Sequence, residues 1–247
     1  MKCFKLKIRA VAHSILDILF PPQCAACGVK LASSSATAIC ETCFSKIPAR
    51  SGFICPACGR RLPDIQNLCH RDAGFILAAA TDYGNAEARE LLHALKYNHI
   101  RSAAHPIAEI LAYYVTELVL HHGLITAGAL LVPIPLHPRR ERLRGYNQAM
   151  LVAQIFASKI SPADLPVVTD ALARVKHTHS QTECADYAER AKNIAGSFVV
   201  KNPDTVFGKT VIIFDDVYTS GATMREAARV LKLAGAKKVV GFVFAKA

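Results

Sequence analysis

Apolar and polar residues follow two different patterns on either side of about residue 75. From residue 76 onward, short apolar runs such as ILAAATDY and ALLVPIP alternate with longer stretches such as GYNQAMLVAQIFASKI. The short runs predict buried strands, and the longer ones, with apolar residues every three or four positions, predict amphipathic helices. Alternating strands and helices are typical of an α/β fold with a mostly parallel sheet flanked by helices.

The spacing of these runs places the individual elements. The sequence predicts a helix that begins after Asn85, a common N-cap residue, and carries Ala88, Leu91, Leu92 and Leu95 on one face. It also predicts helices over residues 106–121, 145–160 and 222–235, and strands over residues 76–83, 129–135, 167–169, 197–200, 210–214 and 239–244. Because these elements fill residues 75–247, we expect one domain there.

Residues 1–20 and 21–74 differ from that domain. Residues 1–20 place basic side chains before the stretch AVAHSILDILF, which is too short and too interrupted by polar residues to span a membrane. A signal peptide would need a small-residue cleavage site, whereas two prolines and a cysteine pair follow. We therefore expect an amphipathic helix over 1–20 that contacts a membrane surface or a partner, a cysteine module over 21–74, and a cytoplasmic protein.

Eight of the nine cysteines lie within the first 69 residues. Seven of them form a pattern of pairs: Cys24, Cys27, Cys40, Cys43, Cys55, Cys58 and Cys69. The first four have the spacing of a structural zinc ribbon, in which each Cys-x2-Cys turn supplies two sulfurs to one ion. Glycine follows each turn in CAACG and CPACG, where a left-handed backbone lets amides face the thiolates. A disulfide framework is the alternative, but a reducing compartment favours zinc.

The second half of the cysteine pattern lacks a fourth cysteine. The segment LCHRD supplies Cys69, and a regular spacing would place Asp72 in the fourth position. His70 is the better zinc ligand by chemistry, but it is adjacent to Cys69. The sequence leaves open a zinc site completed by His70, one completed by Asp72, and a metal-free remnant.

The formal net charge of the chain is +11. Four thiolates around one zinc ion and three around another would lower it to about +8. A chain this basic favours a polyanionic partner such as nucleic acid over a merely solvated surface.

The stretch VIIFDDVYTSGAT, residues 211–223, joins an apolar strand to a helix through two aspartates and several small residues. In open parallel sheets ligands bind at the carboxyl ends of strands, and free amides at a helix start favour phosphate. Asp215 and Asp216 would accept the vicinal hydroxyls of a ribose, with Mg²⁺ able to soften their repulsion. The phosphate would contact residues Thr219, Ser220, Gly221, Ala222 and Thr223. The stretch therefore predicts a sugar-phosphate site rather than a capped helix with solvent-facing acids.

VIIFDDVYTSGAT resembles the 5-phosphoribosyl-1-pyrophosphate (PRPP) signature of type I phosphoribosyltransferases. LLHALKYN, VPIPLHPRRERLRGYNQA and the closing strand, behind paired cysteines, extend the resemblance to the ComF family of competence proteins, with its GntX-like members, from Phe20 onward. It implies a phosphoribosyltransferase-type domain behind a double zinc ribbon, and the handling of incoming single-stranded DNA in natural transformation. It also implies pyrophosphate contacts from a loop after VPIP, which maps onto residues 136–140 and includes Arg139 and Arg140. Arg139, Arg140, Arg142 and Arg144 together would form a basic surface for the DNA backbone.

The sequence does not decide whether the protein turns over PRPP as an enzyme. Thr219 stands where oxopurine salvage enzymes carry an aspartate, which argues against that chemistry. Tyr218 either packs or stacks on a base, and the polar segment 174–193 is either a mobile lid or a DNA surface. One hypothesis is a single-stranded-DNA-handling protein with a pocket for PRPP or a nucleotide, which meets a DNA-uptake helicase or recombination proteins. The other is a transferase that uses PRPP and Mg²⁺ on an unknown acceptor.

Overall fold

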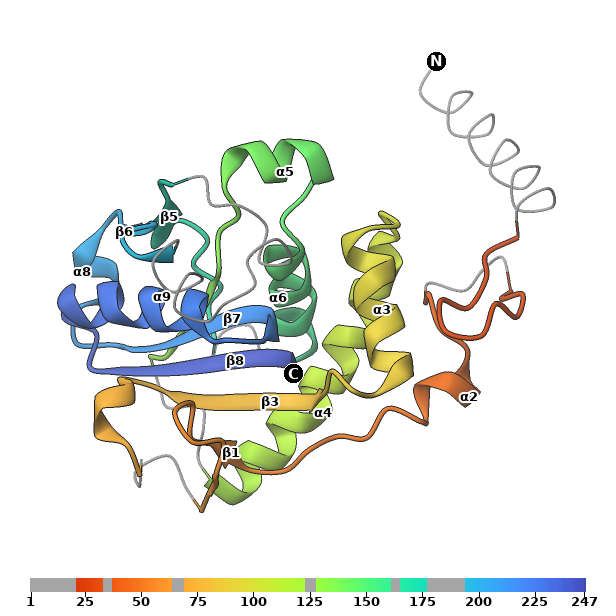
Figure 1. Ribbon diagram of the computed structural model, residues 1–247, viewed down its shortest axis with the longest axis horizontal. Coiled ribbons are helices and arrows are strands. Elements are labelled where there is room, and N and C mark those ends of the chain that lie inside the picture. Colours follow the sequence, from red (N-terminus) through yellow and green to blue (C-terminus); the bar gives the residue numbers. More distant parts are fainter. Residues whose placement is uncertain (1–20, 33–36, 64–68, 123–127, 161–164, 177–193) are drawn as a thin grey trace.

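The computed structural model describes residues 21–32, 37–63, 69–122, 128–160, 165–176 and 194–247. The helix expected over residues 1–20 lies outside them. A six-stranded sheet in the order β2-β1-β3-β8-β7-β4 forms the centre of the molecule (Figure 1). Its strands are β1 (Phe53–Ile54), β2 (Arg61–Leu62), β3 (Ile76–Asp82), β4 (Leu130–Pro133), β7 (Thr210–Tyr218) and β8 (Lys238–Lys246).

The four longer strands of this sheet are parallel. β8 pairs in parallel with β3 and β7, and β7 with β4. The expected α/β fold with a mostly parallel sheet is therefore confirmed. The hairpin of β1 and β2 adds an antiparallel edge, because Ile54 pairs with Leu77 of β3. The cysteine-rich segment thus continues the sheet of the larger domain, and the boundary near residue 75 stays a prediction.

Helices cover both faces of the sheet (Figure 1). On one face lie α3 (Ala86–Lys96), α4 (Ala104–His122) and α6 (Gln148–Lys159), packed against Ile212 and Phe214. On the other lies α9 (Ala222–Leu233), packed against Val211 and Ile213. Alternate residues of β7 therefore enter two separate cores, which explains why this strand is apolar without interruption.

The helix expected after Asn85 is confirmed. The Asn85 side chain accepts a hydrogen bond from the Ala88 amide at 2.9 Å. The expected apolar face is buried, together with Ala94. The remaining short elements are α2 (Glu41–Phe44), α5 (Pro138–Arg144), α8 (Pro203–Val206), and the 3-10 turns Arg71–Ala73 and Arg101–Ala103.

Two of the expected strands differ from the structure. Residues 167–169 form only a single bridge, in which Val167 pairs with Leu131, and the chain then turns away. The expected strand at 197–200 is present as β6 (Phe198–Val200), but it pairs with β5 (Leu172–Arg174) in a separate two-stranded sheet. This hairpin was not predicted because its partner segment is too short to show a periodic pattern.

β7 is longer than the apolar run that predicted it. Its pairing with β8 continues from Asp215, opposite Val243, to Tyr218, opposite Lys246. The two aspartates therefore belong to the carboxyl end of the strand itself rather than to the loop after it. Backbone pairing on one side is enough to keep these polar residues extended.

Candidate functional site

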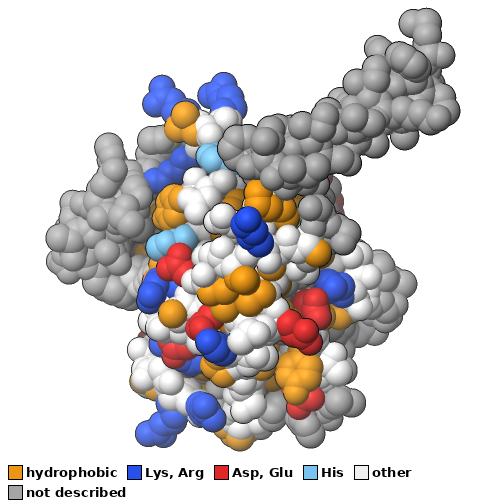
Figure 2. Space-filling view, turned by 90° about the vertical axis from the view of Figure 1, so that its right-hand side faces the viewer, with side chains coloured by type: hydrophobic (Ala, Val, Ile, Leu, Met, Phe, Trp, Pro, Cys, Tyr) orange, Lys and Arg blue, Asp and Glu red, His pale blue; other side chains and the backbone are white. Residues whose placement is uncertain are grey.

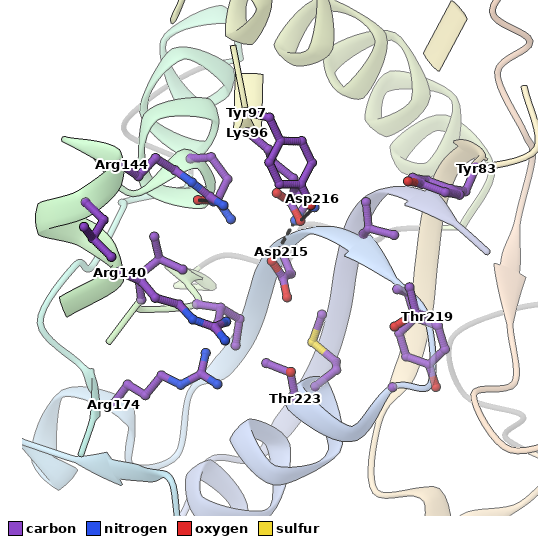
Figure 3. A pocket seen from close by; sticks show the side chains of 18 of the residues that line it. Tyr83, Lys96, Tyr97, Arg140, Arg144, Arg174, Asp215, Asp216, Thr219 and Thr223 are labelled. Carbon is purple, nitrogen blue, oxygen red and sulfur yellow. Dashed lines mark hydrogen bonds and ion pairs between the residues drawn. The ribbon is translucent and has the colours of Figure 1, made fainter. Parts of the chain in front are cut away.

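A pocket of about 580 Å³ opens at the carboxyl end of β7 (Figure 3). This volume is typical of small-molecule sites, which span about 300–1,000 Å³. Side chains from α3, α5, β5, β7 and the start of α9 surround it. They include Tyr83, Lys96, Tyr97, Ile134, Arg140, Arg144, Arg174, Asp215, Asp216, Thr219, Gly221 and Thr223.

The two aspartates of the pocket have different surroundings. Asp216 is 3% exposed, and its Oδ1 forms an ion pair of 2.9 Å with Nζ of Lys96. Asp215 accepts the amide of Asp216 on its own Oδ1 at 2.9 Å, and its side chain points into the open pocket (Figure 3). A protein cation thus neutralises one acid of the pair, while the other faces the space where a ligand would lie.

The proton affinity of Asp215 reflects this position. Burial, and next the negative charge of Asp216, raise the pKa of Asp215 from 3.8 to about 7. The charges of Lys96 and Arg174 act in the opposite direction without cancelling the effect. Asp215 therefore exchanges a proton near neutral pH, and a perturbed carboxyl in a pocket is typical of functional sites.

The loop after β7 needs its glycine. Gly221 has φ 74°, and a Cβ there would lie 2.2 Å from the hydroxyl oxygen of Tyr218. Tyr218 is 5% exposed and donates a hydrogen bond to the carbonyl of Pro56 at 3.1 Å. Of the two alternatives for Tyr218, the structure therefore shows packing. Thr219, Gly221 and Thr223 line the pocket, whereas Ser220 and Ala222 are not part of its lining.

The segment that follows VPIP forms a short helix, α5, which begins at Pro138. Pro138 suits the first turn of a helix, and His137 caps it by accepting the Arg139 amide at 3.2 Å. Gly145, with φ 79°, ends it. The helix separates the four expected arginines into two pairs: Arg140 and Arg144 line the pocket, whereas Arg139 and Arg142 are exposed.

A third arginine, Arg174 of β5, joins this wall (Figure 3). Burial, and next the charge of Arg140, lower the pKa of Arg174 to about 10. The ring of Phe198 lies 5.5 Å from its guanidinium carbon. Two neighbouring guanidinium groups repel, and an anion between them would relieve that repulsion. Sequence reasoning missed Arg174 because it depends on the unpredicted pairing of β5 with β6.

Lys96 was also missed, although LLHALKYN contains it. The sequence pattern identified only the apolar face of α3, and Lys96 is the last residue of that helix. The hydroxyl of Tyr146 donates to the carbonyl of Leu95, and the Asn147 side chain donates to the carbonyl of Ile134 at 3.0 Å. The GYN segment therefore ties α3 and β4 to α6 around the pocket.

The first cysteine cluster has the geometry of a zinc site. The sulfurs of Cys24, Cys27, Cys40 and Cys43 lie within 4.8 Å of one another. Cys27 and Cys40 are 3.8 Å apart, which matches the roughly 3.8 Å between sulfurs that tetrahedral zinc requires. Burial would raise the pKa of Cys24, but amides of the cluster, that of Cys40 first, lower it to about 6. The seven cysteines of the described segments are free thiols.

The second cluster is completed by His70. Its Nδ1 lies 3.5 Å from the sulfur of Cys55 and 3.4 Å from that of Cys69, and Cys58 and Cys69 are 3.5 Å apart. Asp72 does not belong to the group. Of the alternatives left open by the sequence, the structure therefore assembles three thiols and one imidazole, a donor set that fits structural zinc.

The polar segment 174–193, for which a lid and a DNA surface were both open, falls largely outside the described residues. Residues 177–193, with His177 and His179, are not described. Lys176 donates to the carbonyl of Ala195 at 2.9 Å and is not part of the pocket lining. No helix in the described segments is long and apolar enough to cross a membrane.

Comparison with known proteins identifies both parts of the chain. Residues 15–72 match the double zinc ribbon domain, and residues 146–246 match the phosphoribosyl transferase domain. The two cysteine clusters lie within the first match, and the acid pair and the loop after β7 lie within the second.

Curated relatives cover most of the chain. The "DNA utilization protein YhgH" of Salmonella typhi is 30% identical over 225 residues, which are 89% of this chain and 94% of the relative. The chain belongs to the ComF family. "Competence protein ComFC" of Bacillus subtilis is 28% identical over 78% of this chain and 77% of its own length. "Competence protein F" of Haemophilus influenzae is 31% identical over 57% of this chain and 60% of its own length.

Membership of the ComF family confirms the recognition made from the sequence. A phosphoribosyltransferase-type fold behind a cysteine-rich double ribbon is what the chain contains. The names of these relatives connect the family with competence and DNA utilisation.

Proposed function

We propose that this ComF protein handles incoming single-stranded DNA in the cytoplasm during natural transformation, and that its pocket binds PRPP or a related ribose phosphate. The names of the relatives support the first part. A DNA-uptake helicase or recombination proteins would be its partners, and residues 1–20 would contact them or a membrane surface.

The observation that carries the second part is the division of the pocket into an acidic and a basic side. Asp215 and the free oxygen of Asp216 are suited to ribose hydroxyls, which donate hydrogen bonds. The amides and hydroxyls of Thr219, Gly221 and Thr223, which line the pocket, are suited to the 5-phosphate. A pyrophosphate, with the Mg²⁺ that it carries, would lie toward the guanidinium groups of Arg140, Arg144 and Arg174.

The pocket and the DNA strand would use different faces of α5. An acid pair repels phosphodiesters and finds no vicinal hydroxyls in DNA, so the strand is better placed outside the pocket. Arg139 and Arg142 are exposed on the outer side of α5. Lys and Arg side chains project at this end of the molecule in Figure 2, while acidic and basic groups are mixed below it.

The test compares two paired variants. Arg139→Ala with Arg142→Ala should weaken binding of a single-stranded oligonucleotide and lower the slope of log affinity against log salt by about 1.4, since each single-strand phosphate contact contributes about 0.7. Its affinity for PRPP should be unchanged. Arg140→Ala with Arg144→Ala should weaken the binding of PRPP and leave the affinity for the oligonucleotide unchanged. Wild-type protein that binds no oligonucleotide at low salt would refute the DNA-handling role.

A preference for ribose tests the pocket directly. Calorimetry should show that ribose 5-phosphate binds about tenfold more tightly than 2-deoxyribose 5-phosphate, because a missing hydroxyl leaves a buried carboxylate oxygen unpaired. Asp215→Asn with Asp216→Asn should remove this preference. Equal affinities for the two sugars in the wild type would show that the acids do not bind hydroxyls.

A transferase acting on PRPP is the second candidate function. The raised pKa of Asp215, about 7, favours it, because a carboxyl that titrates near neutral pH can accept a proton from an attacking nucleophile. Pyrophosphate release should then be measured across a panel of amine and base acceptors. Turnover that disappears in the double Asp→Asn variant would establish the enzyme.

A further inference from the structure

Lys96 is a buried lysine whose role the proposed pocket function does not yet explain. Its side chain is 18% exposed, and its ammonium lies 2.9 Å from Asp216, whose own side chain is 5% exposed. A lysine this enclosed is costly unless it is paired. Burial would lower its pKa, but the charges of Asp216 and Asp215 outweigh burial and raise it, so Lys96 stays charged at neutral pH.

Contacts with other segments hold the end of α3 that carries this ammonium. The carbonyl of Leu95, one residue earlier, accepts the hydroxyl of Tyr146. The guanidinium of Arg101 stacks over the ring of Tyr146, 5.0 Å from its centroid. Tyr146 therefore holds the last turn of α3 through the Leu95 carbonyl, and Lys96 does not need a ligand to position it.

Asp216 uses only one of its two oxygens. Oδ1 contacts Lys96, while Oδ2 is buried without a hydrogen-bond partner in the described part of the chain. A buried carboxylate oxygen without a donor is costly, and Asp216 lines the pocket. The free oxygen therefore points to a ligand that brings a hydrogen-bond donor.

We propose that Lys96 is a positioning residue that serves as a built-in cation beside the acid pair. The ammonium holds Asp216 so that its second oxygen faces a ligand hydroxyl, and it offsets one negative charge of the acid pair without a metal ion. The ligand class is a phosphorylated ribose whose hydroxyls are bound at the acid pair independently of Mg²⁺. This inference rests on the proposed ribose-phosphate function of the pocket.

The test is calorimetric binding of ribose 5-phosphate in a buffer freed of Mg²⁺ and in millimolar Mg²⁺, without a chelator, because a chelator would remove zinc from the cysteine clusters. Wild-type affinity should differ by less than about twofold between the two buffers. Lys96→Met should lose about tenfold or more in the Mg²⁺-free buffer and regain part of that loss in Mg²⁺, which then replaces the missing cation. Lys96→Arg should stay independent of Mg²⁺. Lys159→Met is the matched control, since Lys159 forms only a 4.0 Å surface pair with Glu109.

The possible results distinguish the role of Lys96 from the ribose-phosphate function of the pocket. A wild type that binds only with Mg²⁺, or a Lys96→Met variant that equals the wild type in the Mg²⁺-free buffer, overturns the role of Lys96 alone. A wild type that binds no ribose phosphate in either buffer overturns the pocket function and this inference together. Should Lys96→Met lose its native circular dichroism, Lys96→Gln carries the same expectation with a polar end group.

Discussion

The two cysteine clusters share the same Cys-x2-Cys turn but have different neighbours. The first is linked to the end of β3 and the start of α3, where the Thr81 hydroxyl donates to the carbonyl of Pro48 and the Asn85 side chain to that of Lys46. The second follows β1 at the sheet edge, and its Pro56 carbonyl accepts the hydroxyl of Tyr218 from the pocket. A repeated sequence unit thus has two roles, set by what each copy touches.

The second cluster is therefore connected directly to the loop of residues 219–223, which follows β7. Pro56 lies between Cys55 and Cys58, so a zinc ion bound by these two thiolates would fix the direction of its carbonyl. That carbonyl holds the Tyr218 hydroxyl, which lies directly over Gly221. In the described chain, no residue of the first cluster lines the pocket. We therefore expect the pocket to respond to the second cluster and not to the first.

Removing each cluster in turn tests the comparison with the largest expected effect. Cys55→Ser with Cys58→Ser should lose one of two zinc ions and weaken ribose 5-phosphate binding by about tenfold or more, equivalent to about 1.4 kcal/mol. Cys24→Ser with Cys27→Ser should also lose one zinc but keep its affinity. Zinc is measured by atomic emission and affinity by calorimetry. Equal losses of affinity would erase the distinction between the clusters.

Gly221 tests the contact between Tyr218 and the loop. Gly221→Ala places a Cβ in a left-handed backbone, which costs about 1–2 kcal/mol, and also against the Tyr218 ring. Gly208→Ala is the matched control, because it has φ 68° but no heavy atom within 4 Å of its Cβ. Urea unfolding should show a clearly larger loss for Gly221→Ala, together with lost ligand binding. Equal losses would mean that Tyr218 yields, and that the second cluster does not hold it.

Tyr218→Phe removes the hydrogen bond from the Tyr218 hydroxyl to the Pro56 carbonyl, which links the pocket to the second cluster. Loss of a buried hydrogen bond costs about 1 kcal/mol of stability, and we expect a fewfold loss of ribose 5-phosphate affinity. Tyr114→Phe is the control, since Tyr114 donates to the Gly52 carbonyl at 2.6 Å far from the loop. It should lose similar stability with unchanged affinity. If both variants bind ribose 5-phosphate equally well, the Tyr218 hydrogen bond has no effect on the ligand affinity of the pocket.

Local patterns in the sequence were enough for much of this architecture. The uninterrupted apolar run of β7 predicted a strand buried on both faces, and Asn85 predicted the start of α3. The spacing of Cys24, Cys27, Cys40 and Cys43 predicted one cluster because two turns of equal shape bring their sulfurs together. Each of these signals lies within one short segment, where the physical cause is local.

Residues placed by long-range packing could not be found in this way. Lys96 reaches Asp216 only because α3 ends beside the carboxyl end of β7, and Arg174 reaches Arg140 only through the β5–β6 hairpin. His70 was one of two candidates because sequence spacing does not describe how the chain turns after Cys69. The acid pair was predicted from one segment, residues 211–223. The different surroundings of Asp215 and Asp216 depend on three segments, because Lys96 and Arg174 come from two other parts of the chain.

The pH dependence of folding stability gives the smallest expected effect. It distinguishes the pocket from the cysteine clusters, because the two contributions change with pH in opposite directions. The folded-state pKa of Asp215, about 7, lies above its ordinary 3.8, so the folded chain binds a proton that the unfolded chain releases. Its stabilising effect is complete below pH 3.8 and is lost as the pH rises through 7. Zinc clusters change in the opposite direction, because acid protonates their thiolates.

Asp215→Asn should therefore raise the melting temperature relative to the wild type, by about 2–4 °C for each kcal/mol recovered, and the gain should be clearly larger at pH 8 than at pH 5, where part of the stabilising effect is still present. Asp72→Asn, outside both the pocket and the second cluster, is the control and should give the same difference from wild type at both pH values. Scanning calorimetry at constant ionic strength measures this. A gain of equal size at pH 5 and pH 8 would mean that Asp215 is an ordinary acid, and that the pocket contributes no pH dependence of its own beside that of the clusters.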